Sequence, residues 1–496
     1  MEILEHLLFG LQIAFAPINL FYAFIGCLVG TLIGVLPGIG PAGGMALLIP
    51  LTYGKEPASA IILLAGIYYG AMYGGSTTSI LLNVPGEAAS VVTTLDGYQM
   101  AKKGRAGAAL SIAAIGSFIA GTIGLLLLMM VGPPLAQVAL KFGPAESCAL
   151  MFFGLSTVTS LSGKSLRKGL VATTLGLMLA TVGSDLPTGV IRFTFGSAKL
   201  MEGIDVVVIA IGLFAVSEVF ISAEEMGAGR LVVDKLSRIW LSMREFLRST
   251  GAILRGSVLG FFIGVLPGAA HVAAAFLAYT LEKRIARNPD DFGKGEIRGV
   301  AAPESANNSA ACGALIPLLT LGLPASAVTA VLYSALLMTG IRPSPFLFEK
   351  HPDVVWGLIG SMYIGNAMLL VLNLPLVFLW VKVLKTPSRW LFPIVLVVSF
   401  IGVYSINSSA LDLVLATLLG VLGYVMRRLD YPLAPVILGF VLGVLLEQSL
   451  RQTLMISGGS LEIFWRSPIA VTLFLMSAAL IVLPQVLSRR LRRNRD

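Results

Sequence analysis

The sequence predicts an all-α polytopic membrane protein with two inverted-topology repeats, each containing a re-entrant hairpin and a broken helix. We expect about 11 membrane spans in addition to the two hairpins. Of the 496 residues, 56% are hydrophobic and only 12% are charged, whereas a soluble domain carries roughly 25% charged residues. The pentapeptide Gly-Val-Leu-Pro-Gly occurs at 34–38 and again at 264–268. Composition therefore predicts the membrane, and the repeated pentapeptide predicts the duplication.

Each pentapeptide predicts a helix break at membrane depth, because it lies in the middle of an apolar stretch. Proline removes a backbone donor, glycine weakens the helix, and lipid offers no water to the freed backbone groups. Such breaks are tolerated where they are buried in protein or line a polar cavity. Two breaks that lie 230 residues apart predict a duplicated transporter core with its site between the halves.

Apolar runs predict the membrane-spanning elements in order. The two arms of the first hairpin are expected at 19–36 and 42–53, and those of the second at 252–265 and 271–285. The spans of the first half are 106–132, 147–162, 169–184 and 204–221. Those of the second half are 354–381, 390–404, 411–426 and 431–449. An extra run at 467–487 has no counterpart in the first half.

The distribution of charge predicts the sidedness of the loops. A basic cluster at 489–495 directly follows an apolar run, which indicates a cytoplasmic C-terminus. When the spans alternate from that end, 27 of the 35 Lys and Arg residues fall on the cytoplasmic side. The cytoplasmic segments are then 97–105, 163–168, 222–255, 282–300, 382–389, 427–430 and 488–496. This asymmetry follows the positive-inside rule.

The charges beside the hairpins predict that the two repeats are inverted. Both flanks of the second hairpin are basic, so this hairpin opens to the cytoplasm, whereas the first is followed by the weakly charged Lys55 and Glu56 and opens outside. Inverted repeats are the usual architecture of secondary transporters. Parallel repeats are the alternative, because hairpin ends are hard to place from sequence.

The chain is expected to divide into four parts around an amphipathic linker helix. Apolar residues recur at helical spacing from Leu236 to Leu247 with Lys and Arg between them, as in a helix that lies on the membrane surface. The four parts are a first transport repeat at 1–229, this cytoplasmic linker at 230–255, a second repeat at 256–450, and an extra span with a basic tail at 451–496.

A second polar interruption follows each hairpin, at 74–79 (GGSTTS) and at 303–309 (PESANNS). Small hydroxyl and amide residues beside glycine suit a helix start or an unwound turn, where free N–H groups hold a carboxylate. Unwound carbonyls and side-chain oxygens coordinate Na⁺ equally well. The alternative is that small residues only let membrane helices pack closely.

These breaks supply the candidate substrate-binding residues. A carboxylate substrate is expected between the two hairpin tips and the two polar interruptions, without a buried Arg. The candidates are Pro37, Gly38, Gly40, Gly75, Ser76, Thr77, Thr78, Pro267, Gly268, Asn307, Asn308 and Ser309, with Asn83 and Ser326 as second-rank residues.

The candidates for ion coupling are Ser79, Glu87, His271 and Glu304. Ionisable groups within the membrane are costly and mark proton or ion paths. The acidic residues nearest the breaks, which also include Asp96, have the alternative role of capping helix N-termini. His271 has the alternative role of a satisfied structural histidine.

Several other functions are excluded by the sequence. The stretch 38–43 matches GxGxxG literally, but it lies between two membrane arms and contains Pro41, so it predicts no dinucleotide site. There is no HExxH motif and no convincing nucleophile–base pair, and the three cysteines are isolated. Neither an enzyme, a cofactor nor a nucleic-acid partner is expected. The one metal ion that the sequence suggests is a coupling Na⁺.

Long motifs carry a specific resemblance. They are GVLPGIGPAGGMALLIPLTY at 34–53, the stretch from AGIYYGAMYGGSTTS to AKKGRAGAAL at 65–110, GVLPGAAHVAAAF at 264–276, PESANNSAACGALIPLLTLGLPAS at 303–326, and GIRPSPFLFEKHPDVVWGLIGSMYIGN at 340–366. In these motifs the chain resembles the large membrane subunit of the tripartite tricarboxylate transporters (TctA-like). The resemblance spans nearly the whole chain.

The resemblance implies a protein of the bacterial inner membrane that works with a small membrane subunit and a periplasmic solute-binding protein. It also implies import of carboxylates such as citrate, driven by a Na⁺ or proton gradient. An elevator-like movement follows only by analogy with other two-hairpin carboxylate transporters. The alternatives are a standalone carboxylate carrier or exporter, or an ion channel, since broken helices also build pores.

Overall fold

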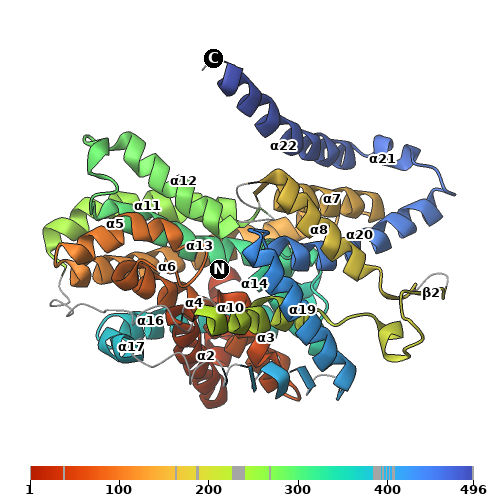
Figure 1. Cartoon of the computed structure of the whole chain (residues 1–496), viewed down its shortest axis with the longest axis horizontal. Coiled ribbons are helices and arrows are strands. Elements are labelled where there is room, and N and C mark those ends of the chain that lie inside the picture. Colours follow the sequence, from red (N-terminus) through yellow and green to blue (C-terminus); the bar gives the residue numbers. More distant parts are fainter. Residues whose placement is uncertain are drawn as a thin grey trace.

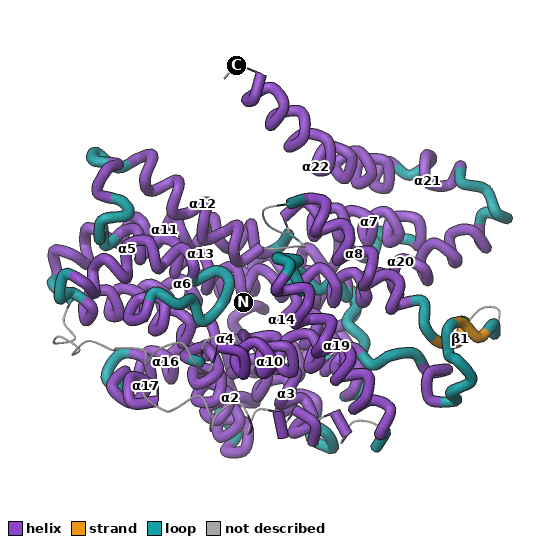
Figure 2. The backbone as a smooth tube through the Cα atoms, in the orientation of Figure 1, coloured by secondary structure: helices purple, strands orange, loops and turns teal. Residues whose placement is uncertain are grey.

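The computed structural model describes residues 2–36, 40–161, 165–185, 189–225, 241–266, 270–383 and 408–493, with short stretches between 393 and 404. Nearly all of this is helical (Figure 2), apart from β1 (Gly183–Ser184) and β2 (Ile191–Arg192), which pair antiparallel. Seven of the described helices are long and apolar enough to cross a membrane. The prediction of an all-α polytopic membrane protein is confirmed.

The helices of the first half follow the predicted order, with one additional element at the N-terminus. They are α1 (Glu2–Ala14), α2 (Pro17–Val35), α3 (Gly40–Leu48), η1 (Ile49–Thr52), α4 (Pro57–Leu82), α5 (Val91–Lys102), α6 (Ala106–Ala139), α7 (Pro144–Leu161), α8 (Leu166–Ala180), η2 (Lys199–Glu202), α9 (Val206–Ala210), the π-helical η3 (Ile211–Val216) and α10 (Ser217–Glu225). The additional helix α1 packs against α16 of the second half.

The second half contains a similar succession. Its helices are α11 (Met243–Gly264), α12 (Ala270–Ile285), η4 (Pro289–Asp291), α13 (Arg298–Leu321), α14 (Ala327–Met338), α15 (Leu347–Lys350), α16 (Pro352–Asn373), α17 (Val377–Val383), α19 (Ala410–Arg428), α20 (Ala434–Ile456), α21 (Glu462–Arg466) and α22 (Pro468–Arg493). The last helix, which corresponds to the extra predicted span, packs on α7 and leads away from the body of the molecule (Figure 1).

Two predicted element boundaries are wrong. The single span expected at 354–381 is two helices, α16 and α17, because Pro375 falls between them and cannot continue the helix. The linker helix expected at 230–255 lies partly outside the described residues. Its described part, 243–255, belongs to α11, which runs unbroken into the second hairpin and begins with a capping box between Ser242 and Glu245.

Stripes of small residues lie where the first arm of each hairpin packs on the long helix after that hairpin, α2 on α4 and α11 on α13. Gly30 of α2 packs so closely on α4 that an added Cβ would lie 2.7 Å from the Cα of Ile67. Gly260 of α11 packs on α13 in the same way, with Ala306 Cα at 2.6 Å from an added Cβ. Gly26 and Gly34, like Gly256 and Gly264, extend these stripes at four-residue spacing. The pentapeptide repeat is therefore part of a longer structural repeat.

The helices α4 and α13, which occupy equivalent places in the two halves, form the centre of the molecule. Every residue from Ala58 to Ile80 of α4 and from Gly299 to Thr320 of α13 is buried. Contacts join Ser76 to Glu304 and Tyr69 to Cys312, so the two helices run antiparallel. Equivalent helices in inverted repeats are expected to do so, although the membrane orientation of the repeats stays a prediction.

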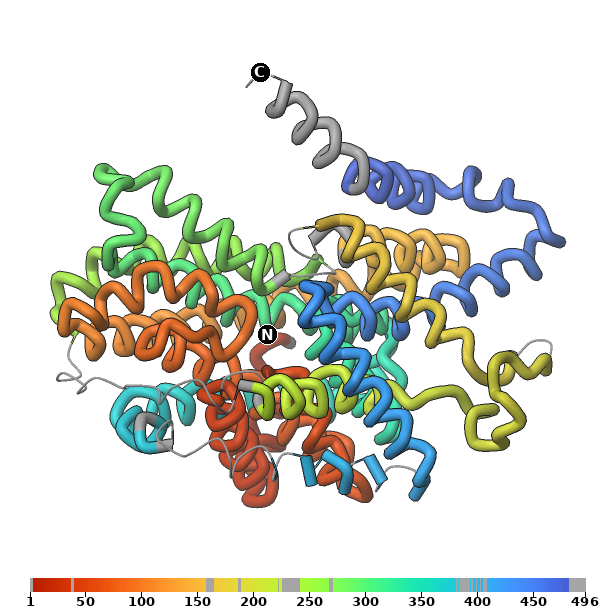
Figure 3. Tube along the Cα trace, viewed as in Figure 1, coloured from red at the N-terminus to blue at the C-terminus, as the bar shows by residue number. Residues whose placement is uncertain are grey.

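The two halves are interleaved and do not form separate lobes (Figure 3). Helix α6 of the first half packs along α13 of the second, and α16 of the second packs along α4 of the first. Farther out, α8 packs on α20 and η3 packs on α19. Each half therefore completes the packing of the other, which places the interface between the repeats in the buried core.

Ion pairs gather segments that the charge pattern assigns to one side. Arg105 pairs with Glu245 at 2.6 Å and Arg248 pairs with Glu296 at 2.5 Å, which joins the predicted cytoplasmic segments 97–105, 222–255 and 282–300. Arg451, predicted to lie outside, pairs with Asp185. The structure thus groups these loops as the charge pattern predicts, without assigning either face to the cytoplasm.

Candidate functional site

The helix breaks lie later than predicted, by about one turn in the first half and by more than three turns in the second. Helices α4 and α13 continue through 74–79 and 303–309, so the expected helix starts or unwound turns at those positions are wrong. The polar side chains do not force a break because some of them bond within their own helix, as when Ser79 Oγ donates to the carbonyl of Gly75 at 3.0 Å. The helices end instead at Asn83 and Gly322, both with positive φ, each followed two residues later by a proline.

The polar residues of α4 and α13 meet where these helices cross. Ser76 Oγ of α4 donates to Glu304 Oε2 of α13 at 2.5 Å. Thr93 of α5, which follows the break after α4, donates its hydroxyl to the other oxygen of Glu304. The carboxyl group from the second repeat is therefore held by two hydroxyl donors from the first.

Glu87 has the reciprocal arrangement. It lies in the loop between α4 and α5, and its side chain accepts a hydrogen bond from Nδ2 of Asn307 in α13. Gly75 makes room for it, since a Cβ at this position would lie 2.7 Å from Glu87 Cγ. Ser90 closes the loop by donating to the carbonyl of Glu87 at 2.8 Å. The carboxyl group from the first repeat is therefore held by a donor from the second.

Both carboxyl groups are buried without a cationic partner. Glu87 is 8% exposed and Glu304 is 1% exposed. Among the residues that the structure describes, no ion pair joins either side chain to Lys, Arg or His. An unpaired buried carboxylate is costly, so such groups are neutralised by a proton or a bound cation.

The other predicted residues of this region lie beside the crossing. Asn308 faces α6, where its amide donates to Ser117 Oγ at 2.7 Å. The hydroxyl of Ser309 also faces α6, since it lies 3.0 Å from a Cβ added at Gly124. Thr77 lines a small cavity with Ser117 and Asn373. Thr78 bonds within its own helix. These residues therefore do not converge on the two carboxyl groups.

The second-rank candidates are located at helix ends. Asn83 is the left-handed residue that ends α4, with φ of 58°. Ser326 is the N-cap of α14 and forms a capping box with Thr329. Both have a structural role of their own, and their proposed contact with substrate stays a prediction.

Most of the two hairpin tips lies outside the described residues, including Pro37, Gly38, Pro267 and Gly268. Gly40 begins α3, with φ of 65°. His271 lies in the first turn of α12, and its Nε2 is 2.7 Å from the hydroxyl oxygen of Tyr68 on α4. This contact brings the start of the second arm of one hairpin against the central helix of the other repeat.

Asp96 has a structural role that explains its burial. Its carboxylate accepts the backbone N–H groups of Gly293, Gly295 and Glu296, and the hydroxyl of Tyr279 at 2.9 Å. It therefore fastens α5 of the first repeat to the loop before α13 of the second. Asp96 lies in the middle of its own helix, α5, but its carboxylate reaches the start of α13. There it accepts the N–H of Glu296, just before the N-cap Ile297, which agrees with the alternative role at a helix N-terminus.

Sequence reasoning missed Thr93, Tyr68 and the contact of Tyr73 with Asn366 at 2.5 Å. A usable signal existed for the tyrosines, since the hydroxyl of a tyrosine in an apolar membrane helix needs a partner. No local signal distinguishes Thr93 from a threonine that bonds within its own helix.

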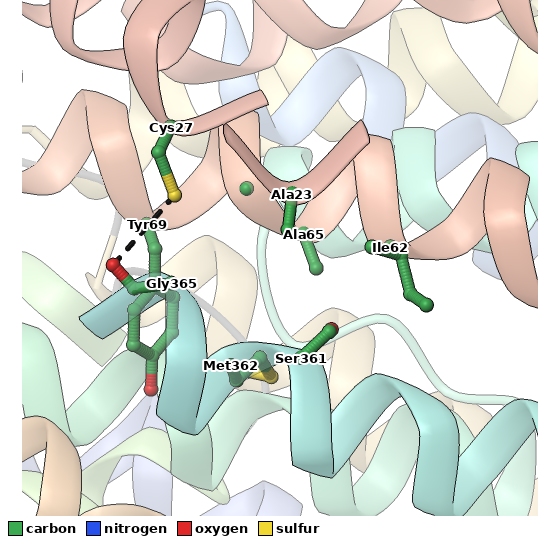
Figure 4. A pocket seen from close by; sticks show the side chains of 9 residues that line it. Ala23, Cys27, Ile62, Ala65, Tyr69, Ser361, Met362 and Gly365 are labelled. Carbon is green, nitrogen blue, oxygen red and sulfur yellow. Dashed lines mark hydrogen bonds between the residues drawn. The ribbon is translucent and has the colours of Figure 1, made fainter. Parts of the chain in front are cut away.

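A pocket lined by residues of α2, α4 and α16 is mainly apolar (Figure 4). Cys27 donates weakly from Sγ to the carbonyl of Gly365 at 3.7 Å, and Tyr69, which also lines the pocket, has its hydroxyl bonded to Cys312. This pocket offers no charged group to an anion. In the described part of the chain, no group of three or more His, Cys, Asp or Glu side chains is suited to a metal ion.

The fold defines a class of protein: a nearly all-helical polytopic membrane protein, in which buried carboxyl groups lie where α4 and α13 meet. The family model of the "Tripartite tricarboxylate transporter TctA family" matches residues 20–438. The chain therefore belongs to this family of transporter subunits.

Two relatives match the chain, one over nearly its full length and one over about half of it. The chain is 48% identical over 493 residues to an "Uncharacterized 52.8 kDa protein in TAR-I ttuC' 3'region" of Agrobacterium vitis, covering 99% of this chain and 98% of the relative. It is 47% identical over 234 residues to an "Uncharacterized protein in TAR-II ttuC' 3'region" of the same organism, covering 47% of this chain and 97% of that relative. No solved structure matches the chain.

Proposed function

We propose that this chain is the membrane transport subunit of a binding-protein-dependent secondary transporter that imports carboxylates, such as citrate or other di- and tricarboxylates. A Na⁺ or proton gradient drives the import. The chain works in the bacterial inner membrane with its C-terminus in the cytoplasm. Its partners are a small membrane subunit and a periplasmic solute-binding protein. Membership of the TctA family supports the transporter class and the tripartite organisation.

One observation supports the proposal that transport is coupled to a cation. Glu87 of the first repeat is held by Asn307 of the second, and Glu304 of the second repeat is held by Ser76 and Thr93 of the first. A proton or cation that neutralises these groups acts on both repeats at once. The position of the two repeats relative to each other then depends on whether the cation is bound, as alternating access requires. An elevator-like movement of the hairpins is the form of alternating access that we propose.

The substrate carboxylates are proposed to bind at the hairpin tips, Pro37–Pro41 and Pro267–His271. Support comes from the arrangement around them. Helices α3 and α12 begin at these tips, and their first N–H groups favour anions. His271 and Tyr68 add polar groups at the start of α12.

Uptake into proteoliposomes tests this function. The vesicles contain the chain and its small subunit, with an imposed Na⁺ or pH gradient, and receive labelled citrate, tartrate and a panel of small carboxylates. We expect saturable uptake that requires both the gradient and the solute-binding protein. Ser76→Ala is expected to reduce uptake. Ser334→Ala, which removes a buried hydroxyl bonded only within α14, serves as the matched control.

Two outcomes would contradict the proposed transport function, and a third would contradict the role of the α4–α13 crossing. Saturable uptake without the binding protein would indicate a standalone carrier or exporter. Flux that neither saturates nor follows the gradient would indicate a channel. Equal uptake by Ser76→Ala and Ser334→Ala, at equal expression, would remove the α4–α13 crossing from the transport mechanism.

A further inference from the structure

We propose that the crossing of α4 and α13 is a cation site and not a substrate site. Glu87 and Glu304 supply its charge, and Ser76, Thr93 and Asn307 complete it. The ligand is a small monovalent cation, either a proton or Na⁺. The role of this site in transport rests on the function proposed above, whereas the binding of the cation does not.

The donors at the crossing are already used by the protein's own carboxyl groups. Ser76 and Thr93 donate to the two oxygens of Glu304, and Asn307 donates to Glu87. A substrate carboxylate that entered here would meet two acidic side chains without a cation to offset them. Like charges at close range in a buried site repel strongly. Ser76 and Asn307, which the sequence assigned to the substrate, therefore belong to the cation.

A second observation points independently to a ligand. Asn307 is 2% exposed, and its Oδ1 has no hydrogen-bond partner although it is fully buried. Its amide group is at the crossing, since Nδ2 of the same group bonds to Glu87. A buried acceptor without a partner costs about 1–3 kcal/mol in general. Protonated Glu87 or a bound Na⁺ would satisfy an amide oxygen at this place.

The chemistry of the surrounding groups favours a small hard cation. The five side chains of the site present oxygen atoms and the Nδ2 of Asn307, and carboxylate, carbonyl and hydroxyl oxygens suit hard cations. Tyr68 of α4 interacts electrostatically with Glu87, and Tyr73 of the same helix with Glu304. His271 bonds to Tyr68, and Cys312 bonds to Tyr69. The tyrosines and the cysteine carry no positive charge that would replace the cation. His271 carries none either, because burial disfavours a charged imidazolium.

The test uses the purified full-length chain in nanodiscs, without substrate, small subunit or binding protein. Radioactive ²²Na⁺ binding is measured by scintillation proximity, and the infrared C=O stretch of protonated carboxyl groups is measured as the pH is varied. Wild type is expected to give one of two signals. Either it binds Na⁺ saturably, or it shows protonated carboxyl bands that titrate and are absent from the variants.

The variants are Glu87→Gln, Glu304→Gln and Asn307→Ala. Each glutamine substitution keeps the shape of the side chain and removes its charge, so we expect Na⁺ affinity to fall about tenfold or more, or one carboxyl band to disappear. Asn307→Ala keeps both carboxyl groups and removes only the amide, so it reports on the site if a glutamine variant fails to fold. The matched control is Glu146→Gln, whose carboxylate caps α7 by accepting the N–H of Gly143.

Three results would overturn the inference. One is unchanged Na⁺ affinity and unchanged carboxyl bands in folded Glu87→Gln and Glu304→Gln. Another is the absence of both Na⁺ binding and protonated carboxyl bands in wild type. The third is tighter binding of labelled citrate or tartrate by these variants while wild type binds no cation. In that case the carboxyl groups of Glu87 and Glu304 would occupy the place of the substrate carboxylates. Cation binding without carboxylate uptake would leave this site intact and reject the proposed function.

Discussion

The close packing of α11 on α13 makes Gly260→Ala a sharp test of the helix contacts. A Cβ at position 260 would lie 2.2 Å from the carbonyl oxygen of Ala306, whereas ordinary contact begins at 3.4 Å. The two helices must therefore separate by about 1.2 Å, along a stripe that includes Gly256 and Gly264. Overpacking of this kind costs about 1–3 kcal/mol. Because the backbone of α13 is the obstacle, no side-chain rotation relieves it.

The measurement is the unfolding midpoint in detergent micelles, followed by intrinsic tryptophan fluorescence at one heating rate. Gly251→Ala is the matched control in the same helix, since its Cβ would meet only the flexible end of Arg255 at 3.0 Å. We expect a clearly lower midpoint for Gly260→Ala and no loss for Gly251→Ala. Equal midpoints for the two variants would refute the reasoning that these helices are held in backbone contact.

Three further predictions follow from single contacts. Asp96→Ala should speed hydrogen exchange of the amides of Gly293, Gly295 and Glu296, because it removes their acceptor. The N–H of Glu296 is buried, so leaving it unpaired costs about 1–3 kcal/mol. Asp291→Ala is the exposed control, and unchanged exchange would contradict the role of Asp96. Tyr68→Phe should cost about 0.5–1.5 kcal/mol and shift the NMR signals of the His271 ring; unshifted signals would show that the contact does not form. Gly75→Ala should displace Glu87 and lower uptake. In a Glu87→Ala background the same substitution should lower uptake little further, because the clash with the Glu87 side chain is gone. Losses of uptake that add in the double variant would contradict this contact.

Much of the architecture was predictable from the sequence, because its signals are local. The apolar runs predicted α6, α7, α8, α19 and α20 to within a few residues, except that α6 and α20 each end seven residues later than predicted. The pentapeptides predicted where the first arms end: α2 ends at Val35, directly before Leu-Pro-Gly, and α11 ends at Gly264, one residue earlier in its pentapeptide.

The polar interruptions were less predictable, for a physical reason. Gly, Ser, Thr and Asn weaken a helix in water, yet in a buried membrane helix they bond to the preceding turn or to a neighbouring helix, and α4 and α13 stay continuous. The strong breakers are the left-handed Asn83 and Gly322, with Pro85 and Pro324 after them. The prediction gave too much weight to small polar residues and too little to these pairs.

By itself, the sequence determined that this is a helical membrane protein, because hydropathy acts over a few residues. The duplication and the two re-entrant hairpins, which it also predicted, stay predictions. It also singled out Ser76, Glu87, Glu304 and Asn307 as functional candidates. Only the tertiary structure decided which of them meet. Glu87 and Asn307 are 220 residues apart in sequence, and their contact depends on the antiparallel crossing of α4 and α13. Whether a serine or an asparagine faces a substrate or a carboxyl group of its own chain is decided by that crossing.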